Sequence, residues 1–331
     1  MKCLNKLFRG KIVSILMSGC LVLSLSGCGN TAYELPYDAN SAVSGFNVIA
    51  DGKSDVADSF AQNLCITNKD LVDAAFANTE DAGSAILFDL NNSEVLYSQN
   101  AHERLSPASL TKVLTALVAL KHATPDTVLT ATDAVYVDES GAQLCGIKPG
   151  DTMTLNQALY IALVYSANDA ALLIADNIGG SVDGFVEMMN EEAKALGATN
   201  SNFVNPHGLT HENQYTTAYD LYLIFNEALK YEKFTEIIQT SSYETTYQNG
   251  SGEAVQLSVR NTNKYVNGDV KAPENVTVIG GKTGTTNAAG HCLMVLSKDN
   301  NGAPYVSIIL KAGSRDNLYA QMTDLLEEIG K

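Results

Sequence analysis

Basic side chains are scarce in this 331-residue sequence, which has 21 Lys and Arg against 37 Asp and Glu and a formal net charge of −16. A nucleic-acid-binding protein needs a basic surface that displaces counterions from phosphate, so this charge balance argues against that class. The sequence also lacks internal repeats and low-complexity tracts. With 45% hydrophobic and 18% charged residues it can bury a sizeable core, and we expect a globular protein.

The apolar run near the N-terminus, Ile12–Ser26, is shorter than the roughly 20 residues that a membrane-spanning helix needs. It follows a basic head made of Lys2, Lys6, Arg9 and Lys11. A basic head and a short apolar run are typical of a secretory signal peptide. The run ends in Leu25-Ser26-Gly27-Cys28, which resembles the bacterial lipobox, whose cysteine is diacylated and becomes the new N-terminus.

We therefore expect a lipoprotein signal peptide at residues 1–27 and a lipid on Cys28. The alternatives are a plain export signal and an uncleaved anchor. The lipid would tie an exported protein to the outer face of the bacterial cell membrane.

Few cysteines remain once this segment is removed and Cys28 carries a lipid. Cys65, Cys145 and Cys292 are left, in a compartment that permits oxidation. Three cysteines cannot all pair within one chain, so at most one disulfide is possible, and the sequence does not choose it.

Residues 28–63 are rich in Ser, Asn, Asp, Ala and Gly and show no sustained periodicity. They are typical of a flexible tether. Patterned segments then run to the C-terminus without another linker-like break, so residues 64–331 are expected to form one catalytic domain.

The domain begins with "SAILFDL" and "EVLYSQ", which flank Asn91-Asn92-Ser93 and predict a β-hairpin. A mostly helical middle follows, with helices ending near His122 and at Gly179-Gly180, and a capped start at Thr217–Asp220. The segments "VTVIGGKTGTT", "HCLMVLSK" and "YVSIILKAG" then predict three strands before a closing helix at about 316–329. This order predicts an α+β fold in which the N- and C-terminal strands share one antiparallel sheet.

The stretch "SPASLTKVLTAL" carries a serine and a lysine at a predicted helix start. Ser106 suits the N-cap and Pro107 the first helical position. Ser109 and Lys112 are then three residues apart on one face, close to free backbone N–H groups. A serine nucleophile needs a base, and a desolvated lysine near another cation can be neutral enough to serve. Taken alone, Ser-x-x-Lys arises about once by composition in such a chain, so a capped helix with a solvated lysine is the alternative.

Two further motifs favour the catalytic interpretation of Ser109 and Lys112. Ser166-Ala167-Asn168 lies in a polar break between two apolar helices, where a turn can direct two polar side chains into a cleft. Lys282-Thr283-Gly284, followed by Thr285, lies on a predicted strand, and composition alone produces it in only about one chain in ten. Gly284 leaves room for a substrate backbone, and a lysine beside hydroxyls suits a substrate carboxylate.

The three motifs, in this order, resemble those of the penicillin-recognising serine enzymes. The likeness is greatest to the low-molecular-weight penicillin-binding proteins, the D-alanyl-D-alanine carboxypeptidases. It runs from "AILFDLNNSEVLYSQNAHERLSPASLTK" through "SANDAALLIA" and "NFVNPHGLTHENQYTTAYDL" to "GGKTGTTNAAGHCLMV". The resemblance implies a β-lactamase/transpeptidase-like fold.

The resemblance also implies residue roles. Ser109 would be the acylated nucleophile and Lys112 its general base, while Ser166 and Asn168 would relay a proton and hold the substrate amide. The backbone N–H groups of Ser109 and Thr285 would form the oxyanion hole.

Lys282, Thr283 and Thr285 would grip the terminal carboxylate of the substrate. Arg315, at the start of the closing helix, matches a carboxylate-assisting position less securely, and a surface arginine is the alternative. No cofactor is expected. No metal is expected either, because Pro206 and Gly208 argue against a helical His207/His211 pair and the sequence supplies no third ligand nearby.

The implied reaction is removal of the terminal D-Ala of peptidoglycan stem peptides through an acyl-enzyme, with β-lactams acylating the same serine. An endopeptidase on the same scaffold, a class A β-lactamase and a non-catalytic penicillin-sensing or wall-binding lipoprotein are the alternatives. The lactamases use a Glu-x-x-Leu-Asn segment between the second and third motifs, and this sequence has none there.

Overall fold

A computed structural model describes residues 63–72 and 77–331 of the chain. The predicted signal peptide, Cys28 and the predicted tether up to residue 62 lie outside the described residues. Within the described part, no helix combines the length and the apolar character of a membrane span.

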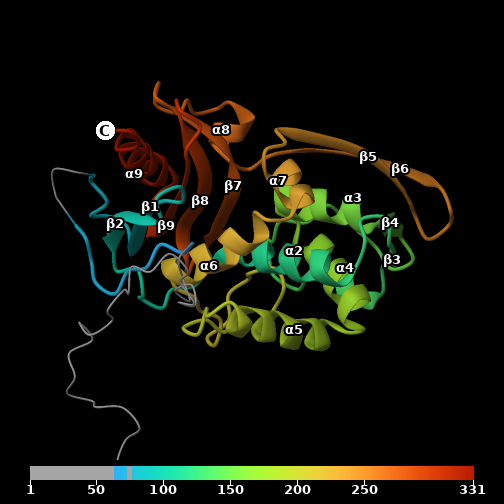
Figure 1. Ribbon diagram of the computed structural model, residues 1–331. Helices are drawn as coiled ribbons and strands as arrows, with labels where there is room; N and C mark the ends of the chain where they lie inside the picture. Colours follow the sequence, from blue (N-terminus) through green and yellow to red (C-terminus); the bar gives the residue numbers. More distant parts are fainter. Residues whose placement is uncertain (1–62, 73–76) are drawn as a thin grey trace, which may run out of the picture. The chain divides into compact units, whose positions relative to one another are not determined.

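Strands from both ends of the domain form one five-stranded antiparallel sheet, in the order β2-β1-β9-β8-β7 (Figure 1). The strands are β1 Ser84–Asp89, β2 Glu94–Gln99, β7 Val276–Thr286, β8 Gly290–Asp299 and β9 Pro304–Ala312. The predicted sheet of N- and C-terminal strands is confirmed, because β1 pairs with β9. This order puts β7 at one edge of the sheet.

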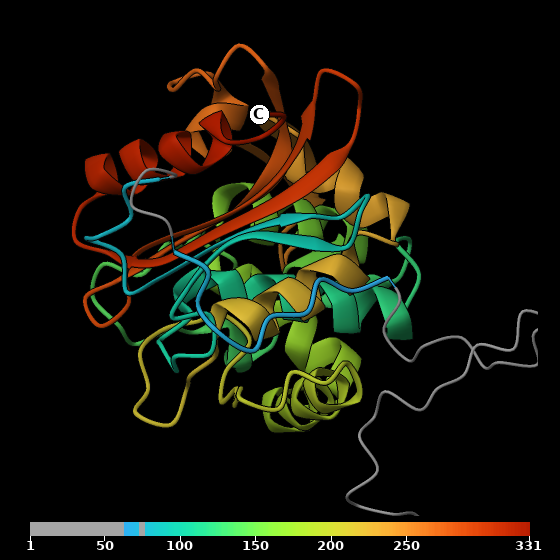
Figure 2. The same cartoon turned by 60° about the vertical axis from the view of Figure 1, so that its left-hand side comes forward.

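Alternate residues of the same strands enter two different cores, as the two-residue period of a strand requires. In β1, Ile86 and Phe88 pack into the core shared with the helical region, whereas Ala85 and Leu87 pack into a smaller core beneath α9 (Arg315–Glu327). Figure 2 shows α9 lying along one face of the sheet, with the helices between residues 111 and 238 on the opposite side. The short helix α8 (Lys264–Asn267) contacts α9 through Tyr265 and Tyr319. Both faces of the sheet are therefore covered, which explains its apolar strands.

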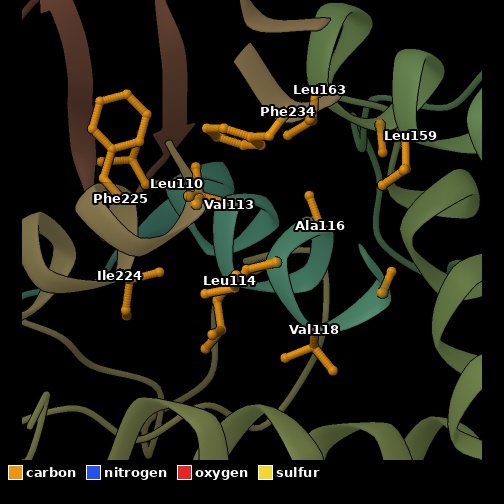
Figure 3. Close-up of a cluster of buried hydrophobic side chains, with 14 of the residues drawn as sticks. Leu110, Val113, Leu114, Ala116, Val118, Leu159, Leu163, Ile224, Phe225 and Phe234 are labelled. Atoms are coloured by element: carbon orange, nitrogen blue, oxygen red, sulfur yellow. The ribbon is translucent and has the colours of Figure 1, made fainter. Parts of the chain in front are cut away.

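The helical region surrounds α2 (Thr111–His122), whose residues from Thr111 to Ala119 are all buried. In Figure 3, apolar side chains at the start of α2 and along it meet side chains from other helices on several sides. The other main helices are α3 Leu155–Tyr160, α4 Asn168–Gly179, α5 Val182–Ala195, α6 Ala218–Ala228 and α7 Glu232–Ile238. Because side chains on every side of α2 are buried over this stretch, the core holds the start of α2 in place.

Several predicted helix boundaries are confirmed by their local geometry. Gly180 ends α4 in a left-handed conformation, and α2 ends at His122. The Thr217 side chain accepts a hydrogen bond from the Asp220 backbone N–H and caps α6.

A second sheet, in the order β3-β4-β5-β6, was not predicted. Its strands are β3 Val128–Thr130, β4 Thr152–Thr154, β5 Ser242–Gln248 and β6 Ala254–Arg260. All four strands are short or leave every second residue exposed. They lack the apolar pattern by which a buried strand is recognised in a sequence.

Candidate active site

Ser109 lies in a tight 3-10 turn, Ala108–Leu110, directly before α2. The prediction that Ser106 caps this helix is wrong: the α-helical part starts only at Thr111, and no side chain caps either the turn or the helix. The turn closes instead through a backbone hydrogen bond from Leu110 N to the Pro107 carbonyl. Ala108 has a φ of 46°, so the chain changes direction just before the serine.

Two glycines allow other segments to pack directly against this turn. A Cβ atom on Gly208 would lie 1.8 Å from the Ala108 carbonyl oxygen, and one on Gly284 would lie 3.0 Å from the Ser109 nitrogen. Gly208 also has a φ of 90°, a left-handed conformation that favours glycine. The "NPHGL" loop and β7 therefore enclose the turn and fix the orientation of Ser109.

Lys112 is completely buried, and its Nζ has three oxygen partners. It lies 2.9 Å from Ser109 Oγ, 2.7 Å from Asn168 Oδ1 and 2.6 Å from the backbone oxygen of His207. The pKa of Lys112 is held well below its usual value, first by burial and then by the positive charge of Lys282. The structure thus brings the predicted nucleophile and base together, in surroundings that favour a neutral amine.

The second and third motifs meet in the same way. Lys282 Nζ donates hydrogen bonds to Ser166 Oγ at 2.7 Å and to the Thr283 carbonyl oxygen at 2.9 Å. Ser166 has left-handed backbone angles, φ 70° and ψ 28°, in the break between the preceding helical segment and α4. Lys282 is 1% exposed, and burial lowers its pKa to about 7. This amine can therefore exchange a proton with Ser166 near neutral pH.

A cavity of about 730 Å³ opens over these groups. The predicted residues that line it are Ser109, Ser166, Asn168, Thr283, Gly284, Thr285 and Arg315. Lys112 and Lys282 lie behind this lining, buried against the serines. All nine predicted side chains or backbone positions thus gather at one cavity, although Arg315 is exposed at its rim.

Asp169 supports the site but was not predicted. Its side chain, in a residue only 2% exposed, accepts hydrogen bonds from the backbone N–H groups of Cys145, Gly146 and Ile147 at 2.8–3.2 Å. These bonds fasten a loop, residues 139–143 of which line the cavity, to the start of α4. A sequence gives no sign of such a contact, because its partners are main-chain groups apart from Cys145 Sγ, which donates to Asp169 Oδ1 at 3.5 Å.

The two histidines considered as a metal pair have other partners. His207 Nδ1 accepts from the Leu209 N–H and His211 Nδ1 from the Asn213 N–H. Burial, and then Lys112, lower the pKa of His207 to about 3, so its ring is neutral. Among the described residues no group of three or more potential metal ligands occurs, and Cys65, Cys145 and Cys292 are free thiols.

Comparison with known proteins points to one family. A family model described as D-alanyl-D-alanine carboxypeptidase matches residues 71–314. The carboxypeptidase DacF of Bacillus subtilis is 35% identical over 251 residues, covering 75% of this chain and 61% of that protein. The carboxypeptidase DacC of Escherichia coli is 32% identical over 246 residues, covering 71% and 58%. The chain thus spans about three fifths of the length of these two relatives.

Two further similarities concern related activities. A D-alanyl-D-alanine endopeptidase of Escherichia coli is 31% identical over 244 residues, covering 74% of this chain and 76% of that protein. The crystal structure of the Streptomyces K15 DD-transpeptidase superposes with a TM-score of 0.70 at 26% identity, over 76% of this chain and 98% of that one.

The Gly208→Ala variant tests the packing around the nucleophile turn. The added methyl group collides with the Ala108 carbonyl and displaces Ser109, and a shift of about 1 Å at a nucleophile can cost on the order of 100-fold in rate. Acylation of Ser109 by a labelled penicillin should slow by about that factor. Gly302→Ala is the matched control, because Gly302 also has a left-handed φ, 89°, but no atom within 4 Å of the added group. Equal rates in the two variants would contradict the packing argument.

The Asp169→Asn variant tests the electrostatics. The Asp169 carboxylate raises the pKa of Lys112, against the larger effects of burial and Lys282. Removing its charge lowers that pKa further, so the neutral base persists at lower pH. In the pH profile of the acylation rate, the decline on the acid side (the acid limb) should shift to lower pH, even if the loosened loop lowers the maximal rate. Asp183→Asn, at an exposed residue on α5, is the charge-matched control; an unmoved or higher acid limb in Asp169→Asn would refute the effect.

Proposed function

The chain belongs to the D-alanyl-D-alanine carboxypeptidase family, and from that premise we propose that it removes the terminal D-Ala of peptidoglycan stem peptides through an acyl-enzyme on Ser109. The observation that carries the proposal is the buried Lys112 amine, 2.9 Å from Ser109 Oγ at the edge of a large polar cavity.

The partners of Lys112 explain how it acts as a base. A neutral amine has two N–H bonds and one lone pair. The Asn168 side-chain oxygen and the His207 carbonyl oxygen can only accept hydrogen bonds, so they take both N–H groups. Ser109 is the one partner that can donate, and the lone pair of Lys112 therefore points to its hydroxyl proton.

Acylation moves the Ser109 proton to Lys112 and supplies another proton to the leaving amine. Ser109 Oγ attacks the carbonyl carbon of the penultimate D-Ala as its proton moves to Lys112. The backbone N–H groups of Ser109 and Thr285 would stabilise the oxyanion. The leaving D-Ala amine takes a proton delivered through Lys282 and Ser166, whose side chains are 2.7 Å apart. Lys112 then releases the serine proton to solvent and Lys282 regains one, so both lysines return to their starting state. A water molecule, deprotonated by neutral Lys112, attacks the ester carbonyl, and Lys112 returns the proton to Ser109 Oγ as the ester bond breaks.

Substrate binding rests on the sheet edge and on positive charge. Thr283–Thr286 of the edge strand β7 line the cavity, so an extended peptide can lie along them and bond to their main-chain groups. The terminal carboxylate would be bound by Lys282, Thr283, Thr285 and the exposed Arg315. A β-lactam carboxylate would occupy the same place.

Endopeptidase activity is the second candidate. Relatives named D-alanyl-D-alanine endopeptidase, from Escherichia coli and Pseudomonas aeruginosa, match the chain over 76% of their length, a larger share than the carboxypeptidases above. Cleavage of a cross-link uses the same acyl-enzyme chemistry, but the leaving amine then belongs to a second stem peptide.

Release of D-Ala tests the proposal. The wild-type protein should release free D-Ala from a D-Ala-D-Ala-terminated pentapeptide, and Ser109→Ala should abolish release because no acyl-enzyme forms. Ser140→Ala, which removes another serine hydroxyl from the cavity wall, should stay active.

Other outcomes identify the alternatives. No release by the wild type, or equal release by Ser109→Ala, disproves the proposal. Preferential cleavage of a cross-linked dimer supports the endopeptidase, fast penicillin turnover without peptide cleavage supports a lactamase, and stoichiometric penicillin labelling alone supports a sensor.

The lipid anchor is a further part of the proposal. The sequence "LSGC" ending at Cys28 supports diacylation of Cys28 and attachment to the outer face of the cell membrane. In bacteria expressing the full chain, the wild type should incorporate labelled fatty acid and sediment with membranes, and Cys28→Ser should do neither. Cys20→Ser, a cysteine within the expected signal peptide, is the control. Incorporation of label by Cys28→Ser would rule the proposal out.

A further inference from the structure

His291 and Thr285 form a polar pair at the cavity. They lie opposite each other on the antiparallel strands β8 and β7. Thr285 Oγ1 and His291 Nδ1 are 3.2 Å apart, within hydrogen-bonding distance, and both residues line the cavity that holds Ser109. The histidine thus contacts a residue assigned to the carboxylate of the substrate, yet it takes no part in the acylation steps above.

The protonation of His291 decides what Thr285 can offer a ligand. A threonine hydroxyl has a single proton to donate. If Nδ1 of His291 lacks a proton, Thr285 donates to it and presents only lone pairs to the cavity. If Nδ1 carries a proton, as it does in one tautomer of the neutral ring and always in the charged ring, it donates to Thr285 Oγ1, and the hydroxyl proton is free to point at a carboxylate. Proton uptake by the ring therefore fixes Nδ1 as the donor.

The charges around His291 favour the unprotonated ring in the absence of a ligand. The charged groups on the elements packed against it are Lys282 on β7, Lys311 on β9, Arg315 and Asp316 at the start of α9, and Asp324 and Glu327 farther along α9. Burial and then Arg315 lower the pKa of His291, and the Asp316 side chain is 95% exposed. A carboxylate that enters beside Thr285 adds the missing negative charge and favours proton uptake by the ring.

We propose that His291 is a positioning residue that couples proton uptake to carboxylate binding, by holding the Thr285 hydroxyl as a donor toward the terminal carboxylate of the substrate. This inference rests on the proposed function, in which Thr285 binds that carboxylate. Because the protonated form binds the ligand better, affinity rises as pH falls through the pKa of His291 in the complex.

The test separates binding from chemistry. For the wild type, KM for a D-Ala-D-Ala-terminated peptide should fall about three- to tenfold between about pH 8 and pH 5, the effect of one hydrogen bond to a charged group. In His291→Asn, which keeps a polar side chain that does not titrate, the fall in KM should be clearly smaller, because only the titration of Lys282 beside the carboxylate remains. The pH profile of kcat, set by Lys112 and Lys282, should be retained.

Two controls sharpen the result. His122→Asn, at an exposed histidine in the last turn of α2, should behave like the wild type. The same peptide ending in a carboxamide should show no such change in KM in any variant, since it carries no negative charge. A pH dependence of KM in His291→Asn as steep as that of the wild type, or a change confined to kcat, overturns the inference.

Failure of the proposed function would be recognised separately, as no release of D-Ala by the wild type at any pH. The role of His291 is then measured by penicillin acylation of Ser109, because a penicillin carries a carboxylate and its acylation requires no turnover. The ratio of wild-type to His291→Asn acylation rates should rise as pH falls. A ratio that stays constant with pH disproves the coupling.

Discussion

The burial of one lysine amine is the constraint on which the rest of the site depends. Lys112 is sealed from solvent beside a second buried lysine, where a full positive charge is costly. The partners of Lys112 Nζ are uncharged oxygen atoms. The Asp169 carboxylate instead accepts hydrogen bonds from backbone N–H groups. A carboxylate paired with Lys112 would have made it a permanent cation, unable to accept the serine proton.

The fold provides this environment through the core around α2. A helix buried on all sides cannot shift easily, because its side chains are packed against those of its neighbours. Gly208 and Gly284 then let a loop and the sheet edge approach the turn before α2 within van der Waals distance. The nucleophile is thereby held by three separate parts of the chain, whereas residues 139–143 of the cavity wall belong to a loop fastened through Asp169.

Most of the fold follows from local patterns in the sequence. The hairpin, the three late strands, the end of α4 at Gly180 and the Thr217 cap each depend on neighbouring residues, and each was predicted correctly. The helix start at Ser106 was predicted wrongly, because a good capping residue is not used where the loop and β7 impose a tight turn. The second sheet was missed because its strands expose alternate side chains to solvent.

The same distinction between local sequence patterns and tertiary contacts applies to the candidate site. The sequence by itself determined which side chains are present: three short motifs named Ser109, Lys112, Ser166, Asn168 and Lys282, and the structure gathers them at one cavity. Only the tertiary structure decided how those groups behave. The charge and orientation of the lysine amines depend on the His207 carbonyl, on the backbone N–H groups that bind Asp169, and on the depth of burial. A sequence does not reveal these features, because main-chain atoms are common to all residues and burial is set by the fold.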